Sequence, residues 1–144
     1  MVVSRQTYDI EIADVEYLRH RGTPVMARLF KPQGTGPFPI MVELHGGAWV
    51  RGNRLDGEAA NEALARTGVI VVALDFRTEA PYPASIADIN FGIRWCKTQA
   101  ALWHGRPDRI GAMGTSSGAH QAMLVGMRPY DERYTTVTSQ AGTA

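Results

Sequence analysis

Apolar residues recur along the chain with two different spacings. Near the N-terminus Tyr8, Ile10 and Ile12 alternate with polar residues, which predicts a half-exposed strand, and a second strand is predicted near Val25–Phe30. From Pro39 onward, short apolar runs alternate with stretches of helical spacing. The elements expected there are strands at 40–45, 69–74 and 109–113 and helices at 58–66, 85–101 and 117–127. Nearly continuous apolar strands separated by helices predict an α/β fold, with a mostly parallel sheet covered by helices on both faces.

Two of the predicted helices carry patterns that indicate how they pack. The longer one has a single apolar stripe at three- and four-residue spacing, made of Ile86, Ile89, Ile93, Cys96, Ala100 and Trp103. This stripe predicts a surface that packs on the sheet. The last helix has mostly small residues on one face, and we expect that face to approach the sheet closely; it consists of Ala119, Ala122, Met123 and Gly126.

Composition and charge exclude several classes of function. The 144 residues are 44% apolar and 20% charged with a formal net charge of +1, so the chain has no excess of positive charge for a nucleic acid. The longest apolar run, Val69–Leu74, is too short to cross a bilayer. We therefore expect a cytoplasmic protein without a nucleic-acid or membrane partner; a homo-oligomer stays open. Cys96 is the single cysteine, which excludes an internal disulfide, and we expect it in the core.

The run Gly114-Thr115-Ser116-Ser117-Gly118 stands between a predicted strand and a predicted helix. Gly-x-Ser-x-Gly in this position is typical of a nucleophile elbow, a sharp turn that exposes one serine hydroxyl. Ser116 would then have a strained backbone, and the strand and helix would pass too close for Gly114 or Gly118 to carry a side chain. The helix N-terminus offers free amides and partial positive charge to an oxyanion. A glycine-rich turn with an incidental serine is the alternative.

A second glycine-rich segment, His45-Gly46-Gly47-Ala48-Trp49, directly follows the predicted strand Ile40–Leu44. Two adjacent glycines free the backbone to turn its N–H groups inward. Acyl transfer through a tetrahedral intermediate needs such donors about 3 Å from the developing oxyanion. We assign this role to the amides of Gly46, Gly47 and Ser117, with an ordinary Gly-Gly turn as the alternative.

Three side chains beside this segment have individual predictions. We expect His45 to support the loop by hydrogen bonds rather than to abstract a proton. Trp49 is predicted to line the substrate pocket, with plain packing as the alternative. Glu43 lies inside a predicted central strand, where a charge needs a partner, and Arg94 is one candidate.

These motifs resemble those of the α/β-hydrolases, and within them the hormone-sensitive-lipase-like esterases and their formamidase relatives. The segment His45–Trp49 is similar to that group's His-Gly-Gly-Gly motif, and Gly114–Gly118 is similar to its Gly-Asp-Ser-Ala-Gly elbow. The stretch Asp75–Ala84 is similar, in shortened form, to Asp-Tyr-Arg-Leu-Ala-Pro followed by Phe-Pro-Ala. The resemblance implies the α/β-hydrolase fold and a serine hydrolase that needs no cofactor.

The implied reaction is two-step acyl transfer on a small carboxylic ester, in which Ser116 attacks the carbonyl and water releases the acid. A hydrolase of amides or formamides on the same scaffold and a catalytically inactive ligand-binding module are the alternatives. The chain departs from the group's pattern at Ala48, Thr115 and Ser117, which replace a third glycine, an acid and a small apolar residue. Because the oxyanion donors are backbone amides, we expect these departures to affect substrate fit more than the chemistry.

A base for this serine is not evident in the chain. The family's order is Ser, then Asp or Glu, then His, but the one histidine after Ser116 is His120, which lies on the helix that leads away from the serine. Asp131 and Glu132 are predicted to be solvated turn carboxylates. The resemblance therefore covers roughly the N-terminal half of a hydrolase domain, over residues 1–144. We expect a companion C-terminal segment to supply the triad Asp and His.

The remaining histidines give no sign of a metal site. His20 and His104 lie in polar, turn-like surroundings and are predicted to be surface residues. No pair of histidines has metal-ligand spacing with a carboxylate on a shared face. We therefore predict neither a metal nor another cofactor.

Overall fold

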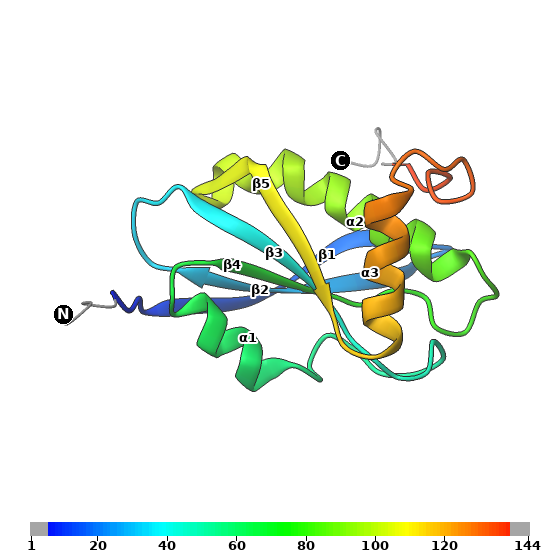
Figure 1. The fold of residues 1–144 in the computed structure, drawn as a ribbon, viewed down its shortest axis with the longest axis horizontal. Helices are drawn as coiled ribbons and strands as arrows, with labels where there is room; N and C mark the ends of the chain where they lie inside the picture. The colour runs from blue at the N-terminus through cyan, green and yellow to red at the C-terminus, as the bar shows by residue number, and fades with distance from the viewer. Residues whose placement is uncertain (1–5, 139–144) are drawn as a thin grey trace.

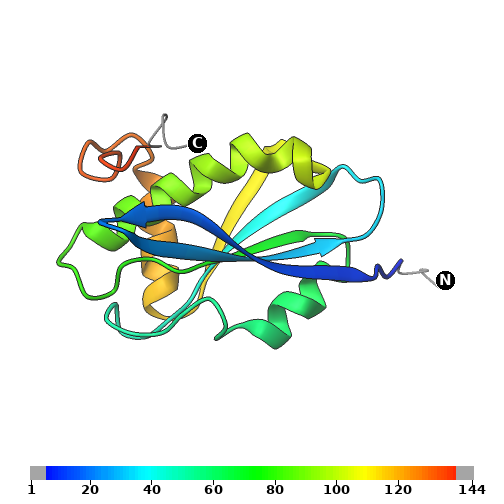
Figure 2. The same ribbon diagram turned by 180° about the vertical axis from the view of Figure 1, so that it is seen from behind.

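The structure, a computed structural model, describes residues 6–138, which form a five-stranded sheet with helices on both faces (Figures 1 and 2). The strands are β1 (Ile10–His20), β2 (Thr23–Pro32), β3 (Phe38–Leu44), β4 (Ile70–Leu74) and β5 (Gly105–Gly114). The helices are α1 (Glu58–Ala65), α2 (Ala84–Gln99) and α3 (Ser117–Met127), and a 3-10 turn, η1 (Ala100–Trp103), follows α2. Each predicted element is present, and the largest differences are that β1 and β5 are longer than expected.

The sheet combines a parallel part with an antiparallel hairpin. Its strand order is β1-β2-β4-β3-β5, in which β3 is parallel to both β4 and β5. The hairpin β1–β2 is antiparallel and joins the rest through the antiparallel pair β2–β4. Because Leu44 is paired with both Leu74 and Gly114, the carboxyl ends of the three parallel strands meet at one edge. The segments that follow these strands therefore start side by side.

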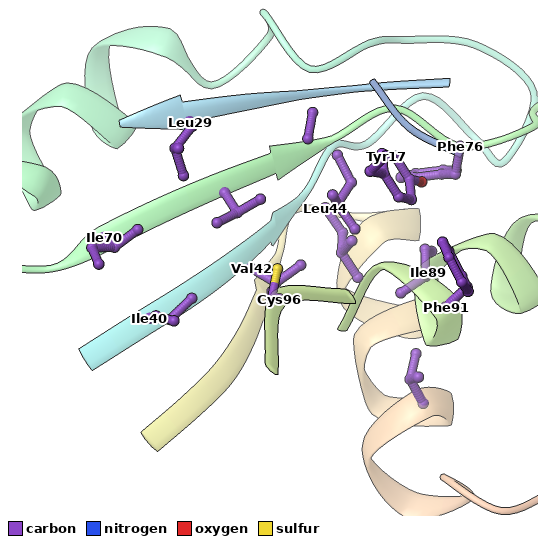
Figure 3. Packing of buried hydrophobic residues seen from close by; sticks show 14 of the residues in the cluster. Tyr17, Leu29, Ile40, Val42, Leu44, Ile70, Phe76, Ile89, Phe91 and Cys96 are labelled. Carbon is purple, nitrogen blue, oxygen red and sulfur yellow. The ribbon is translucent and has the colours of Figure 1, made fainter. Parts of the chain in front are cut away.

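Side chains of β4 show how the core is divided between the two faces of the sheet. All five residues of this strand have 0% exposure, and they alternate between two clusters. Ile70, Val72 and Leu74 face the larger cluster, which Figure 3 shows together with residues of α2. Val71 and Ala73 face the smaller one, which includes Ala65 of α1. Because β4 is buried on both faces of the sheet, its sequence is a continuous apolar run.

The predicted apolar stripe is confirmed; it runs along α2 and continues into η1. Its members belong to the larger cluster, with Ile93 partly buried and the other five buried; those five are Ile86, Ile89, Cys96, Ala100 and Trp103. Burial raises the pKa of the Cys96 thiol to about 12, so this thiol is an inert core group.

The predicted packing face of α3 is partly wrong. Met123 is 62% exposed and nothing lies within 4 Å of a Cβ built on Gly126. The buried positions are instead Ser117, Gly118, Gln121 and Val125. Gly118 determines which face of α3 is buried, because it lies directly against the end of β3. The residues three, four and seven positions later then face the same way.

Strand β1 continues eight residues beyond the predicted Ile12. A register irregularity between Glu16 and Leu18 interrupts the pairing with β2, and Tyr17 between them is buried at 5% exposure. Tyr17 packs against Phe91 and Trp95 of α2. Asp14, Glu16 and Arg19 in this half of β1 are exposed, whereas His20 is only partly exposed. The alternation of apolar and polar residues continues to Tyr17, five residues beyond Ile12. No helix within residues 6–138 has the length and apolar character needed to cross a membrane.

Candidate active site

Ser116 lies at the carboxyl edge of the sheet, in the turn between β5 and α3 (Figure 1). Its backbone has φ 54° and ψ −121°, a region that residues with a side chain rarely adopt, and the residue is exposed. It immediately precedes the first residue of α3. The turn therefore presents the Ser116 hydroxyl at the N-terminus of a helix, the arrangement that the sequence predicts.

The two glycines of the motif are required by close contacts. A Cβ on Gly114 would lie 2.3 Å from the Gly118 carbonyl carbon, and a Cβ on Gly118 would lie 2.1 Å from the Leu44 carbonyl oxygen. Both distances are far below the contact distance of two heavy atoms. The backbones of β3, β5 and α3 thus meet around Ser116 with no room for a side chain at residue 114 or 118.

The segment that follows β3 lies next to this turn. A Cβ on Gly46 would lie 3.0 Å from the Thr115 carbonyl oxygen and 3.4 Å from Ser116 Cβ. Within residues 6–138, the amides of residues 46–48 and of Ser117 donate no hydrogen bond to another group of the chain. The structure thus places Gly46 beside Ser116, and within the described residues the amides of both segments are free of other partners. The sequence did not single out the amide of Ala48, although it is equally free.

His45 is buried at 2% exposure at the base of this segment. Its Nδ1 lies 2.7 Å from the Gly46 carbonyl oxygen, so Nδ1 carries the proton and donates. The imidazole ring stacks on the ring of Phe76, with the centroids 4.2 Å apart and an interplanar angle of 3°. Among the described residues, His45 Nε2 has no hydrogen-bond partner. The imidazole therefore fixes the backbone of the loop and is not exposed to solvent.

Trp49 closes the same segment and reaches across to α3. Its backbone amide donates to Ser117 Oγ at 3.2 Å, and its indole Nε1 donates to His120 Nδ1 at 3.3 Å. The indole itself is 52% exposed. His120 is likewise exposed and, as expected, lies on the helix that leads away from Ser116.

Glu43 has an amide as its partner and not an arginine. Asn61 of α1 donates from Nδ2 to Glu43 Oε2 at 3.3 Å, while Arg94 binds Asn90 and the Val137 carbonyl instead. Glu43 is 7% exposed, and burial raises the pKa of its carboxyl, an effect that the hydrogen bond from Asn61 opposes. The Glu43 carboxyl is therefore a buried acid whose charge is poorly compensated. It lies one residue before the end of β3.

The prediction that His20 is a surface residue is confirmed only in part, because its side chain is 26% exposed and its ring is bound. Its Nε2 lies 2.8 Å from Oδ1 of Asp88, a carboxylate with 0% exposure that also accepts hydrogen bonds from the backbone and guanidinium of Arg77. This cluster adjoins a hollow of about 770 Å³ between the β1–β2 hairpin and residues 75–80. The local sequence does not identify Asp88, because this residue lies on the buried face of α2, between Ile86 and Ile89, and its partners come from distant segments.

His104 is exposed, as predicted. Asp131 is less solvated than predicted, because its side chain is only 14% exposed and binds Arg133 at 2.7 Å, which lowers the pKa of the carboxyl. Among residues 6–138, no group of three or more His, Cys, Asp or Glu side chains could hold a metal ion.

Comparison with known protein families identifies the family to which the Ser116 turn and the glycine-rich loop belong. The BD-FAE family matches residues 28–142, which include both glycine-rich segments and Ser116. The chain belongs to the BD-FAE family. Similar solved structures are esterases of the α/β-hydrolase fold, and the BD-FAE chain thus has that fold in part.

Two relatives of this BD-FAE chain are named as esterases, and both are longer than the part that matches. The chain is 32% identical over 108 residues to Esterase LipC of Mycobacterium tuberculosis, covering 72% of this chain and 27% of LipC. It is 34% identical over 97 residues to a probable isoprenylcysteine alpha-carbonyl methylesterase, ICMEL1, of Arabidopsis thaliana, covering 65% of this chain and 20% of the relative. The chain therefore spans about a quarter of the length of these relatives.

Two solved structures illustrate the likeness of the fold. Esterase Est22, solved with p-nitrophenol, matches with a TM-score of 0.75 and 25% identity, covering 83% of this chain and 39% of Est22. The hyperthermophilic esterase of Pyrobaculum calidifontis matches with a TM-score of 0.73 and 26% identity, covering 84% of this chain and 41% of that enzyme.

Proposed function

We propose that this chain is the N-terminal part, over residues 1–144, of a serine hydrolase that cleaves small carboxylic esters by acyl transfer through Ser116. The observation that carries the proposal is the left-handed, exposed Ser116 beside free amides from two separate segments. The esterase names of the relatives support ester hydrolysis as the class of reaction.

In this proposal the oxyanion of the tetrahedral intermediate is bound by the amides of Gly46, Gly47 and Ser117. Each of these amides is free of other partners among the described residues, so binding the oxyanion breaks no existing hydrogen bond. The Ser117 amide is at the first position of α3, where the helix dipole adds positive potential. Donors held in place before the reaction stabilise the charge without a reorganisation cost.

Two further side chains have supporting roles. His45 keeps the loop in position through its hydrogen bond to the Gly46 carbonyl and its stacking on Phe76. It does not act as the base, since its Nδ1 is engaged by the backbone and its ring is buried. Trp49 lines the substrate site on the side of α3, where its indole is exposed.

The base and its carboxylate partner come from residues outside this chain. His120 is a poor candidate because it lies on α3 beyond the serine, where its Nδ1 accepts from the Trp49 indole. His20 is bound to Asp88, and His104 is at the opposite end of β5 from Ser116. A companion C-terminal segment would supply the Asp and His that activate the Ser116 hydroxyl.

Ser116→Ala in the complete protein, meaning this chain together with the companion segment, tests the proposal. We expect loss of p-nitrophenyl ester hydrolysis and of fluorophosphonate labelling, with unfolding still cooperative. Thr98→Ala, which removes an exposed hydroxyl of α2, is the matched control and should retain both signals. Continued turnover by the Ser116 variant would refute the role of this serine.

Two further measurements separate the alternatives. A panel of p-nitrophenyl esters against aryl formamides distinguishes an esterase from an amide or formamide hydrolase on the same scaffold. Intact-mass analysis of active material tests the companion segment: hydrolysis by a single species of 15.8 kDa would contradict the need for it. Binding of substrate-like ligands without turnover or labelling would instead favour an inactive binding module.

A further inference from the structure

Side chains of the first turn of α3 hold the loop at residues 46–49. Ser117 accepts the Trp49 backbone amide at 3.2 Å, and His120 Nδ1 accepts the indole Nε1–H at 3.3 Å. The Trp49 and His120 rings meet edge to face, with centroids 5.8 Å apart and an interplanar angle of 85°. Because Ser117 and His120 are three positions apart on a helix, they lie on one face and contact Trp49 at two points.

The loop needs such contacts because its backbone is strained. Ala48 and Trp49 have φ values of 54° and 66°, both in the left-handed region that side chains disfavour. Such residues persist only where surrounding structure holds them. The Ser117 hydroxyl does this from a buried position, at 4% exposure, and without it the Trp49 amide loses its acceptor. A small apolar residue at 117 would provide no such bond.

The indole of Trp49 has a similar dependence on His120. At 52% exposure the ring is not fixed by burial, so its orientation depends on specific contacts. The bond to Nδ1 requires that His120 Nε2 carries the proton of the neutral imidazole, since a nitrogen that carries a proton cannot accept. His120 therefore supplies an acceptor, a role that a glutamine can also take.

We propose that Ser117, through its hydroxyl, and His120 are positioning residues that together fix the 46–49 loop and the Trp49 indole as one wall of the site at Ser116. The inference rests on the function proposed for Ser116. The consequence we expect for substrates is that the fixed indole determines the choice between short and long acyl chains. Release of the indole then widens the range of acyl chains that the site accepts.

A spectroscopic test decides the contact without reference to catalysis. In ¹⁵N-labelled full-length protein, the indole signal of Trp49 is identified by its loss in Trp49→Phe. We expect His120→Ala to shift that signal and leave those of Trp95 and Trp103 in place, while His120→Gln restores it in part. His104→Asn, which removes a histidine at the far end of β5, is the control and should leave the Trp49 signal in place. An unmoved Trp49 signal in His120→Ala overturns the proposal.

Kinetics on the complete protein test the consequence. Ser117→Ala should lower kcat about fivefold, the effect of one lost hydrogen bond, with KM unchanged. His120→Ala should reduce the preference for acetate over octanoate esters about tenfold, and His120→Gln should recover part of it. Adding His120→Ala to Trp49→Phe should cause no further loss of that preference, whereas additive losses contradict the proposal. If the parent enzyme hydrolyses no ester, the proposed function fails while the indole signal still decides the contact.

Discussion

Gly118 of α3 lies against the Leu44 carbonyl at the end of β3, so close that a Cβ at residue 118 would be 2.1 Å from the oxygen. This contact brings the N-terminus of α3 onto the carboxyl edge of the sheet. It also determines which face of α3 is buried, since Gln121 and Val125 follow Gly118 at helical spacing. The position of Ser116 between β5 and α3 thus depends on a glycine two residues later.

Gly118→Ala is expected to destabilise the protein by several kcal/mol, about 3 or more, because backbone atoms must move to admit the methyl group. Gly126→Ala, on the same helix, is the matched control: nothing lies within 4 Å of its Cβ, and alanine favours a helix by about 1 kcal/mol over glycine. Urea unfolding of the two variants should give shifts of opposite sign. A mild effect of Gly118→Ala would show that the helix can retreat from β3.

The backbone of Ser116 leads to a second prediction, which concerns stability alone. With φ 54° and ψ −121°, this residue is in a region that costs about 1–3 kcal/mol for a residue with a side chain. Glycine avoids much of that cost, so Ser116→Gly should be more stable than Ser116→Ala by about 1 kcal/mol, even after its larger unfolded-state entropy. Urea midpoints at equal slope measure the difference. Equal stability of the two variants would mean that the turn is unstrained.

Local signals in the sequence predicted the parts of the site that depend on backbone geometry. Gly114 and Gly118 have spacing that only a tight turn explains, and the structure has no room for a side chain at either. Gly46, the first of the two glycines that follow an apolar strand, lies beside Ser116. Such features are encoded within a few neighbouring residues, which is why a single chain suffices to predict them.

Contacts between distant segments could not be predicted in this way. His20 and Asp88 are 68 positions apart, and each reads locally as an ordinary polar residue. The partner of Glu43 is Asn61, on a helix that contributes to the opposite core cluster from α2. The prediction that Met123 is on the buried face of α3 is wrong because the helical pattern allows more than one buried face. Only the packing of Gly118 on β3 selects between them.

Glu43 gives a prediction about pH. Burial raises the pKa of its carboxyl above 4.5, so the folded state binds this proton more tightly than the unfolded state does. Ionised Glu43 therefore costs stability; the cost is fully present above the folded pKa and disappears below 4.5. Glu43→Gln keeps an oxygen for Asn61 and should stabilise the protein by about 1 kcal/mol at neutral pH. Thermal unfolding should show that this gain shrinks as the pH falls towards 4.5.

The control for that series is Glu132→Gln, which alters an exposed carboxyl and should have little effect at either pH. A gain from Glu43→Gln that is independent of pH would contradict the assignment of the cost to ionisation. A loss at neutral pH would mean that the charge of Glu43 is itself stabilising, through His45 on the same segment.

Asp88 provides the last prediction, which concerns how the β1–β2 hairpin is attached to α2. Its fully buried carboxylate accepts hydrogen bonds from Nε, Nη2 and the backbone amide of Arg77, and His20 Nε2 lies 2.8 Å from it. Asp88→Asn keeps the size of the side chain but removes the charge that compensates Arg77. Because Arg77 is 34% exposed and can be solvated, the expected cost is that of lost hydrogen bonds at a buried polar group, about 1–3 kcal/mol. Asp108→Asn removes an exposed carboxylate bound to Arg106 and should cause no measurable loss, because solvent screens that pair. His20→Ala should be milder than Asp88→Asn in the same unfolding measurement, since it leaves Arg77 paired. If His20→Ala is as damaging as Asp88→Asn, the stability comes from the attachment of the hairpin rather than from charge compensation.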